Sequence, residues 1–159
     1  MVQISQNNLL VIFGATGDLA KRKLIPALYS LYSQKALEHT SVLAIGRKSF
    51  GSEEFRTYLK SDSIISAESV SDRDEFLKKI DYLELPMNEP AGYEPLRELI
   101  HSHPGKNITF YLSVPQELFE PIVSGIAHIG LNTPSSRVAF EKPFGSDLES
   151  ATKLNAFVA

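Results

Sequence analysis

A short loop with two glycines, GATGDLA at residues 14–20, directly follows the first apolar run of the chain. Gly14 allows a tight turn, Gly17 leaves space for a bound group, and Ala20 lets the following helix pack close to a sheet. Backbone N–H groups at the start of that helix can donate to a diphosphate, and the helix dipole favours its negative charge. The other members of the loop are Ala15, Thr16, Asp18 and Leu19. This spacing predicts a dinucleotide-binding loop.

The same loop has a simpler interpretation, because two glycines can form a strand-to-helix turn that binds nothing. The order of strand, loop, long helix and second strand favours nucleotide binding instead. A GATG sequence also suits sugar epimerases and semialdehyde dehydrogenases. The loop therefore indicates a class of ligand and leaves the enzyme open.

Two cations, Arg47 and Lys48, follow the second apolar run of the chain at residues 42–45. An NAD site usually has Asp or Glu at this place to hold the ribose 2′-hydroxyl, and this sequence has neither there. A guanidinium can instead bind a 2′-phosphate through paired hydrogen bonds. The pair predicts NADP as the cofactor, with NAD as the alternative, and with Lys48 as an auxiliary to Arg47. The competing interpretation is two solvated charges at a strand end.

Hydrophobic periodicity indicates the elements that must position these residues. It predicts strands at 9–13, 42–45, 80–85, 108–114 and 137–140, and helices at 18–32, from 52, 90–101, 116–129 and 148–158. We expect a local kink at Pro26 and an N-cap at Ser52. Alternating strands and helices predict an α/β fold, a doubly wound, Rossmann-like and mainly parallel sheet with helices on both faces. Residues 1–159 are expected to form a single dinucleotide-binding domain.

Composition narrows the other possibilities. The formal charge of -3 gives no general attraction to nucleic acid or to an anionic membrane surface. The sequence has no cysteine, so no disulfide is expected, and we expect no metal site. No apolar run is long enough to cross a bilayer, and the N-terminus lacks the pattern of a signal peptide. These features predict a soluble, cytoplasmic protein.

Three segments together resemble the glucose-6-phosphate dehydrogenase family: GATGDLAKRKLIPALYSLY at 14–32, FYLSVPQELFEPIV at 110–123 and FEKPFGSDLESA at 140–151. Their order and spacing match the N-terminal NAD(P)-binding domain of that family across essentially the whole chain. The resemblance implies oxidation of glucose 6-phosphate to 6-phosphogluconolactone in the oxidative pentose phosphate pathway. The hydride then passes to NADP or, in some bacteria, to NAD.

The resemblance also implies roles for particular residues. It makes 14–20 the pyrophosphate loop, Arg47 the phosphate contact on the adenine side, and Phe119 an aromatic cofactor contact. Lys142 matches a catalytic lysine near both nicotinamide and sugar, where it would orient the substrate rather than act as a base. Of the lysines in the first helix, Lys23 ranks slightly above Lys21 as a contact to the sugar phosphate.

One family motif is absent from the chain. Family members carry a RIDHYLGKE-type segment soon after EKPFG, and it supplies a general-base histidine. The histidines present are expected in surface or capping roles; they are His39, His101, His103 and His128. We therefore expect this chain to bind cofactor but to turn over poorly, and expect the C-terminal substrate domain, with which the family forms homo-oligomers, to be missing.

Two other interpretations stay open at this level. Sugar oxidoreductases such as the glucose-fructose and inositol dehydrogenases also carry a lysine in an EKP segment, although DLAKRK favours a phosphorylated substrate. A stand-alone NADP-binding domain acting as a regulatory or redox-sensing module would also explain the missing base.

Overall fold

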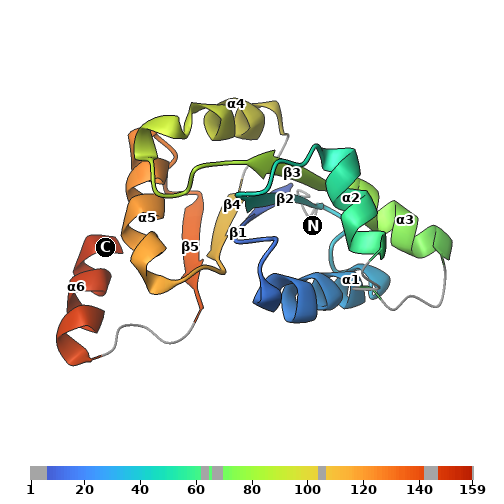
Figure 1. Cartoon of the computed structure of the whole chain (residues 1–159), viewed down its shortest axis with the longest axis horizontal. Coiled ribbons are helices and arrows are strands. Elements are labelled where there is room, and N and C mark those ends of the chain that lie inside the picture. The colour runs from blue at the N-terminus through green and yellow to red at the C-terminus, as the bar shows by residue number, and fades with distance from the viewer. Residues whose placement is uncertain (1–6, 62–64, 66–69, 104–106, 142–146, 159) are drawn as a thin grey trace, which may run out of the picture.

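Five short apolar segments form one parallel sheet in the computed structural model, which describes residues 7–61, 65, 70–103, 107–141 and 147–158 (Figure 1). The strand order is β3-β2-β1-β4-β5. The strands are β1 (Asn8–Phe13), β2 (Thr40–Gly46), β3 (Ile80–Glu84), β4 (Asn107–Leu112) and β5 (Ser136–Phe140). The chain winds outward from β1 in both directions, so the predicted doubly wound fold is confirmed.

Helices cover both faces of the sheet (Figure 1). One face carries α1 (Ile25–Ser33), α2 (Ser52–Ser61) and α3 (Val70–Lys78), and the other carries α4 (Glu94–Ser102) and α5 (Phe119–His128). The last helix, α6 (Leu148–Val158), lies beside α5. The described part of the chain contains no helix that is both long and apolar enough to cross a membrane.

The strand β1 shows why the sheet needs both layers. Leu9, Val11 and Phe13 belong to the core beneath α4 and α5, whereas Ile12 belongs to the core beneath α1, α2 and α3. All four side chains are at most 1% exposed. Successive strand residues point to opposite faces, so a continuous apolar run supplies both cores at once.

The first helix runs through Pro26 without a break. A π-helical turn, Ala20–Leu24, comes immediately before α1, and the Ile25 amide donates to the Ala20 carbonyl. Proline has no N–H, and its ring crowds the carbonyl four residues earlier. The expected disturbance at Pro26 therefore takes the form of a widened turn ahead of the proline.

The sequence predicted no element directly before the strand at 80–85, where the structure has α3; the buried residues of that helix, Phe76 and Leu77, are adjacent and show no helical period. The expectation of an N-cap at Ser52 was wrong. Ser52 does not cap α2: its hydroxyl accepts a hydrogen bond from the Tyr82 amide at 2.9 Å. The Glu54 carboxylate accepts from the Gly51 amide at 2.8 Å instead.

Candidate nucleotide-binding site

The 14–20 loop lies where the strand order reverses. β1 pairs with β2 on one side and with β4 on the other, so the chain leaves the carboxyl ends of β1 and β4 in opposite directions. In open parallel sheets, this switch point forms a crevice in which ligands bind. The loop extends β1 into that crevice, and Ser113 follows β4 directly beside it.

Gly14 meets a steric requirement that no other residue satisfies. Its φ is +83°, and a Cβ there would lie 2.1 Å from the carbonyl oxygen of Ser113. The Ser113 amide also donates to the Phe13 carbonyl at 3.0 Å. The predicted tight turn at Gly14 is present, and the neighbouring strand end fixes it in place.

Several loop amides hold the loop itself together. The amides of Gly14 and Ala15 both donate to the Ile45 carbonyl at 2.9 Å, and the Gly17 amide donates to the Gly14 carbonyl at 3.0 Å. Within the described residues, no backbone carbonyl accepts from Thr16, Asp18 or Leu19. These N–H groups at the start of the helix are the donors that the loop offers to a bound anion.

The space above the loop is open at Gly17. This glycine is exposed, and a Cβ there would contact Gly14 alone, at 3.1 Å from its carbonyl oxygen. Ala20, one helical turn later, is fully buried, so a larger residue there would push the helix from the sheet. The carboxylate of Asp18 pairs with Arg22 at 2.8 Å, which offsets a negative charge beside the anion site.

The Ser113 hydroxyl is a further polar group at the switch point. Its oxygen is buried and has no hydrogen-bond partner among the described residues. Such a group costs free energy unless a ligand satisfies it. Sequence reasoning did not select Ser113, although its position directly after the strand next to β1 was a usable signal.

Arg47 and Lys48 lie at the carboxyl end of β2, and both side chains are exposed. The backbone beneath them is tightly packed: a Cβ on Gly46 would lie 2.6 Å from the Tyr82 hydroxyl and 3.0 Å from a Thr16 side-chain carbon. The Tyr82 hydroxyl donates to the Lys48 carbonyl at 2.7 Å. Burial, with a smaller contribution from the charge of Glu84, raises the pKa of Tyr82 to about 12. The strand tip is therefore fixed relative to the loop.

The structure separates the two candidate lysines of the first helix. The ammonium of Lys21 lies 5.1 Å from the centre of the Tyr58 ring, and the ammonium of Lys48 lies 5.4 Å from the same centre. Lys23 is exposed, two residues further along the π-helical turn. Lys21 thus belongs with the tip of β2, a grouping that the sequence did not indicate.

Phe119 and Lys142 are the two remaining site residues that the family resemblance implies. Phe119 is 2% exposed and its ring centre lies 4.9 Å from that of Phe140, so the structure places it in the core rather than on a ligand-accessible surface. Lys142 lies outside the described residues. The residue before it, Glu141, accepts a hydrogen bond from the Tyr111 hydroxyl of β4.

The histidines have surface or capping positions, as expected. His39, His101 and His128 are exposed. His103 ends α4, where its Nδ1 lies 2.8 Å from the Leu99 carbonyl oxygen.

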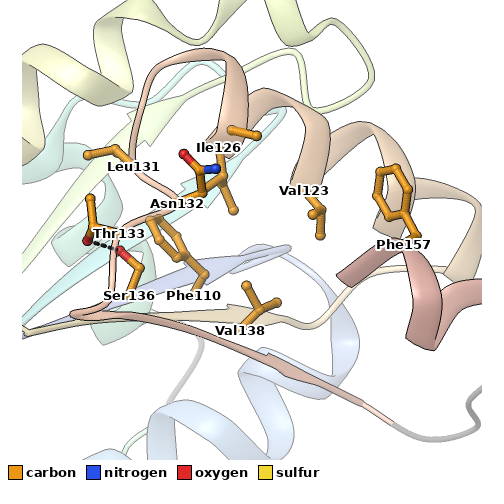
Figure 2. Close-up of a pocket in the computed structure, with 10 residues that line it drawn as sticks. Phe110, Val123, Ile126, Leu131, Asn132, Thr133, Ser136, Val138 and Phe157 are labelled. Carbon is orange, nitrogen blue, oxygen red and sulfur yellow. Dashed lines mark hydrogen bonds between the residues drawn. The ribbon is translucent and has the colours of Figure 1, made fainter. Parts of the chain in front are cut away.

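A separate pocket of about 460 Å³, lined by both apolar and uncharged polar side chains, lies between β4, β5, α5 and the end of α6 (Figure 2). Its wall includes Phe110, Val123 and Phe157, together with a hydrogen bond between the Thr133 and Ser136 hydroxyls. None of the described residues that line it is charged. Because no described cation lines it, the pocket suits a diphosphate less well than the 14–20 loop does.

The switch-point crevice, the glycine loop and the cationic strand tip together define a dinucleotide-binding α/β domain. Residues 11–159 match the family model described as "Glucose-6-phosphate dehydrogenase, NAD binding domain". The chain belongs to this family, which makes a nicotinamide dinucleotide its class of cofactor. The family resemblance is confirmed, and the other EKP-type sugar oxidoreductases are set aside.

Curated relatives agree with the family model. The chain is 35% identical over 151 residues to glucose-6-phosphate 1-dehydrogenase of Borreliella burgdorferi, covering 94% of this chain and 31% of the relative. It is 35% identical over 154 residues to the enzyme of Bacillus subtilis, covering 92% and 31%. The chain therefore spans about a third of the length of the curated relatives that it matches.

Solved structures show the same likeness. Glucose-6-phosphate 1-dehydrogenase from Mycobacterium avium superposes with a TM-score of 0.85 at 33% identity, covering 96% of this chain and 33% of that one. A glucose-6-phosphate dehydrogenase in complex with glucose 6-phosphate gives a TM-score of 0.82 at 30% identity, with 97% and 34% covered. These superpositions confirm the Rossmann-like fold.

Proposed function

We propose that this chain is the NADP-binding domain of a cytoplasmic glucose-6-phosphate 1-dehydrogenase. One observation carries the cofactor assignment: the site combines loop amides that have no described backbone acceptor, those of Thr16, Asp18 and Leu19, with exposed cations at the tip of β2. The amides suit a diphosphate, and the cations suit a phosphate on the adenosine ribose. The names of the relatives support the reaction.

Each part of the crevice has a task in this proposal. The 14–20 loop holds the diphosphate, Gly17 provides the space for it, and the exposed Arg47 side chain grips the 2′-phosphate with two parallel hydrogen bonds. Bound NADP supplies the hydride acceptor. The Ser113 hydroxyl, buried without a partner among the described residues, donates to the ligand at the other side of the switch point.

The substrate side of the proposal depends on Lys23, which is exposed, and on residues beyond the described ones. Lys142 orients glucose 6-phosphate, and Lys23 contacts the sugar phosphate. A proton acceptor for the sugar hydroxyl is needed for hydride transfer, and a second domain of the complete protein supplies it in this proposal. The complete protein is proposed to be a homo-oligomer. The chain alone should bind NADP and show almost no reduction of it when glucose 6-phosphate is added.

The test is a calorimetric titration of NADP+ and NAD+ against the wild-type chain and Arg47→Ala. Loss of a charge-assisted contact should weaken NADP+ by about 1 to 3 kcal/mol and leave NAD+ nearly unchanged. Arg137→Ala is the matched control, because Arg137 is also an exposed arginine but lies near the amino end of β5. Equal losses for the two cofactors, or no loss for either, would overturn the assignment of Arg47 and with it the NADP preference.

A further inference from the structure

Three polar side chains from three elements meet at the outer edge of β3. Arg56 lies in α2, Asp81 lies in β3, and His103 directly follows α4. The Arg56 Nη2 is 2.9 Å from one carboxylate oxygen of Asp81, and the His103 Nε2 is 3.4 Å from the other. Because α2 and α4 cover opposite faces of the sheet, the three side chains wrap around its edge strand. We call Arg56, Asp81 and His103 the edge clasp.

The arginine side of the edge clasp is complete. The Arg56 Nε donates to the carbonyl of Leu77 at 3.0 Å and to that of Ile80 at 2.9 Å, and the Arg56 Nη1 donates to the Glu53 carboxylate. The Arg56 side chain is only 17% exposed, and a guanidinium stays charged throughout the ordinary pH range. This side of the clasp therefore does not change with pH.

The histidine side is complete only when the ring carries two protons. The His103 Nδ1 lies 2.8 Å from the Leu99 carbonyl oxygen, which can only accept, so Nδ1 holds the proton of the neutral ring. Nε2 then presents a lone pair to the Asp81 carboxylate, and two acceptors face each other across 3.4 Å. A second proton makes Nε2 a donor, and the ring then bridges Leu99 and Asp81.

The charges around the ring balance only in its protonated form. Helix α2 contributes the cation Arg56 and the anion Glu53, and β3 contributes the anion Asp81. No other charged side chain in the described part of the chain forms an ion pair with this group. With a neutral His103, two carboxylates share one cation; with a protonated His103, two cations face two carboxylates.

We propose that the edge clasp is a proton-operated switch that ties the end of α4 to the edge of β3. In acid, the protonated His103 donates to Asp81 and the clasp closes. In alkali, the ring keeps its bond to Leu99 alone, and the end of α4 loses its tie to β3. Since α4 belongs to the crossover from β3 to β4, closure holds together the two halves of the sheet. The switch needs no ligand, so it is independent of the proposed function.

Amide hydrogen exchange in the last turn of α4 tests the switch. Histidine side chains change charge between about pH 5 and pH 8, so the wild-type chain is compared at about pH 5.5 and about pH 8, with rates corrected for intrinsic exchange. Protection of the amides at 100–103 should be about two- to fivefold greater at the lower pH, because ion pairs between partly exposed groups contribute modestly.

Two substitutions should each abolish this difference. His103→Gln cannot bind the second proton, and Asp81→Asn offers no charge to a protonated ring. His101→Gln is the matched control, because His101 is an exposed histidine of the same helix, and this variant should keep the wild-type ratio. Thermal melting checks that each variant is folded.

The nitrogen chemical shifts of His103 give a second measurement on the wild-type chain, which decides even where a variant does not fold. They report which ring nitrogen carries the proton, and we expect Nδ1 in the neutral ring. A neutral ring protonated on Nε2, equal protection at the two pH values, or the wild-type ratio in a folded His103→Gln variant would overturn the inference. Neither measurement uses a cofactor, so none of these outcomes bears on the proposed function.

Discussion

Tyr93 packs directly against the backbone of α5 at Gly125: a Cβ on Gly125 would lie 2.4 to 2.6 Å from three atoms of the ring. Tyr93 is fully buried, and its hydroxyl donates to the Met87 carbonyl at 2.9 Å. Its ring centre is 6.3 Å from that of Phe13, the last residue of β1. The ring thus links α5 to the strand that carries the 14–20 loop.

Gly125→Ala should destabilise the chain even though alanine is the better helix former. The ring cannot move far because its hydroxyl and its face are both engaged, so overpacking should cost about 1–3 kcal/mol. Urea denaturation measures the change. Ser124→Ala, in the same helix, is the control and should change the free energy of unfolding by much less. A Gly125→Ala variant more stable than the wild type would contradict the close contact.

Gly14→Ala should be among the most damaging single changes in the 14–20 loop. The added Cβ would clash with the Ser113 carbonyl, and the backbone would keep a positive φ that alanine disfavours. We therefore expect a loss of at least about 2 kcal/mol in the free energy of unfolding. Gly130 separates the two causes, because its φ is +73° and nothing lies within 4 Å of a Cβ built there. Gly130→Ala should show the cost of φ alone, about 1 kcal/mol. Equal losses at the two glycines would exclude the clash.

The hydrogen bond from Tyr111 to Glu141 should couple the two residues energetically. A bond to a carboxylate is worth about 1.5–3 kcal/mol, and both residues are half-buried. A double-mutant cycle of Tyr111→Phe and Glu141→Gln, followed by urea denaturation, should give a coupling of about 1 kcal/mol. Because a glutamine oxygen can still accept a hydrogen bond, simple additivity would show that the negative charge of Glu141 adds nothing to the contact. Because Glu141 precedes Lys142 in the sequence, this bond also anchors the start of the EKP segment.

Stability should fall in alkaline solution because of three tyrosines. Burial raises the pKa of Tyr82 to about 12 and that of Tyr111 to about 12, the latter with help from Glu141, and burial raises the pKa of Tyr93 as well. Above pH 10 the unfolded chain releases phenolic protons that the folded chain keeps. The unfolded state then binds fewer protons, so the free energy of unfolding decreases as pH rises from about 10 to 12.

Urea denaturation at several pH values between 9 and 12 measures this slope. Tyr82→Phe removes one of the three groups and should give a shallower decline than the wild type, whatever its stability at neutral pH. Identical slopes for the two proteins would mean that Tyr82 keeps an ordinary pKa.

The sheet was predictable because its central strands are continuous apolar runs bounded by turn residues. Residues 9–13 are needed by two cores at once, so their composition alone identifies a buried parallel strand. Helix α3 was not predictable in this way, since Phe76 and Leu77 are adjacent and give no helical period.

The amino-acid sequence by itself determined the glycine loop after β1, the two cations after β2 and the family, because these are statements about residue types at fixed spacing. Tertiary structure alone decided that Ile45 occupies two of the loop amides, that Ser113 closes on Gly14, and that Lys21 rather than Lys23 joins Lys48. Each of these contacts joins segments distant in sequence, or depends on the rotation of a helix. Contacts between distant segments and the rotation of a helix are fixed only when α1 and α2 pack against the sheet.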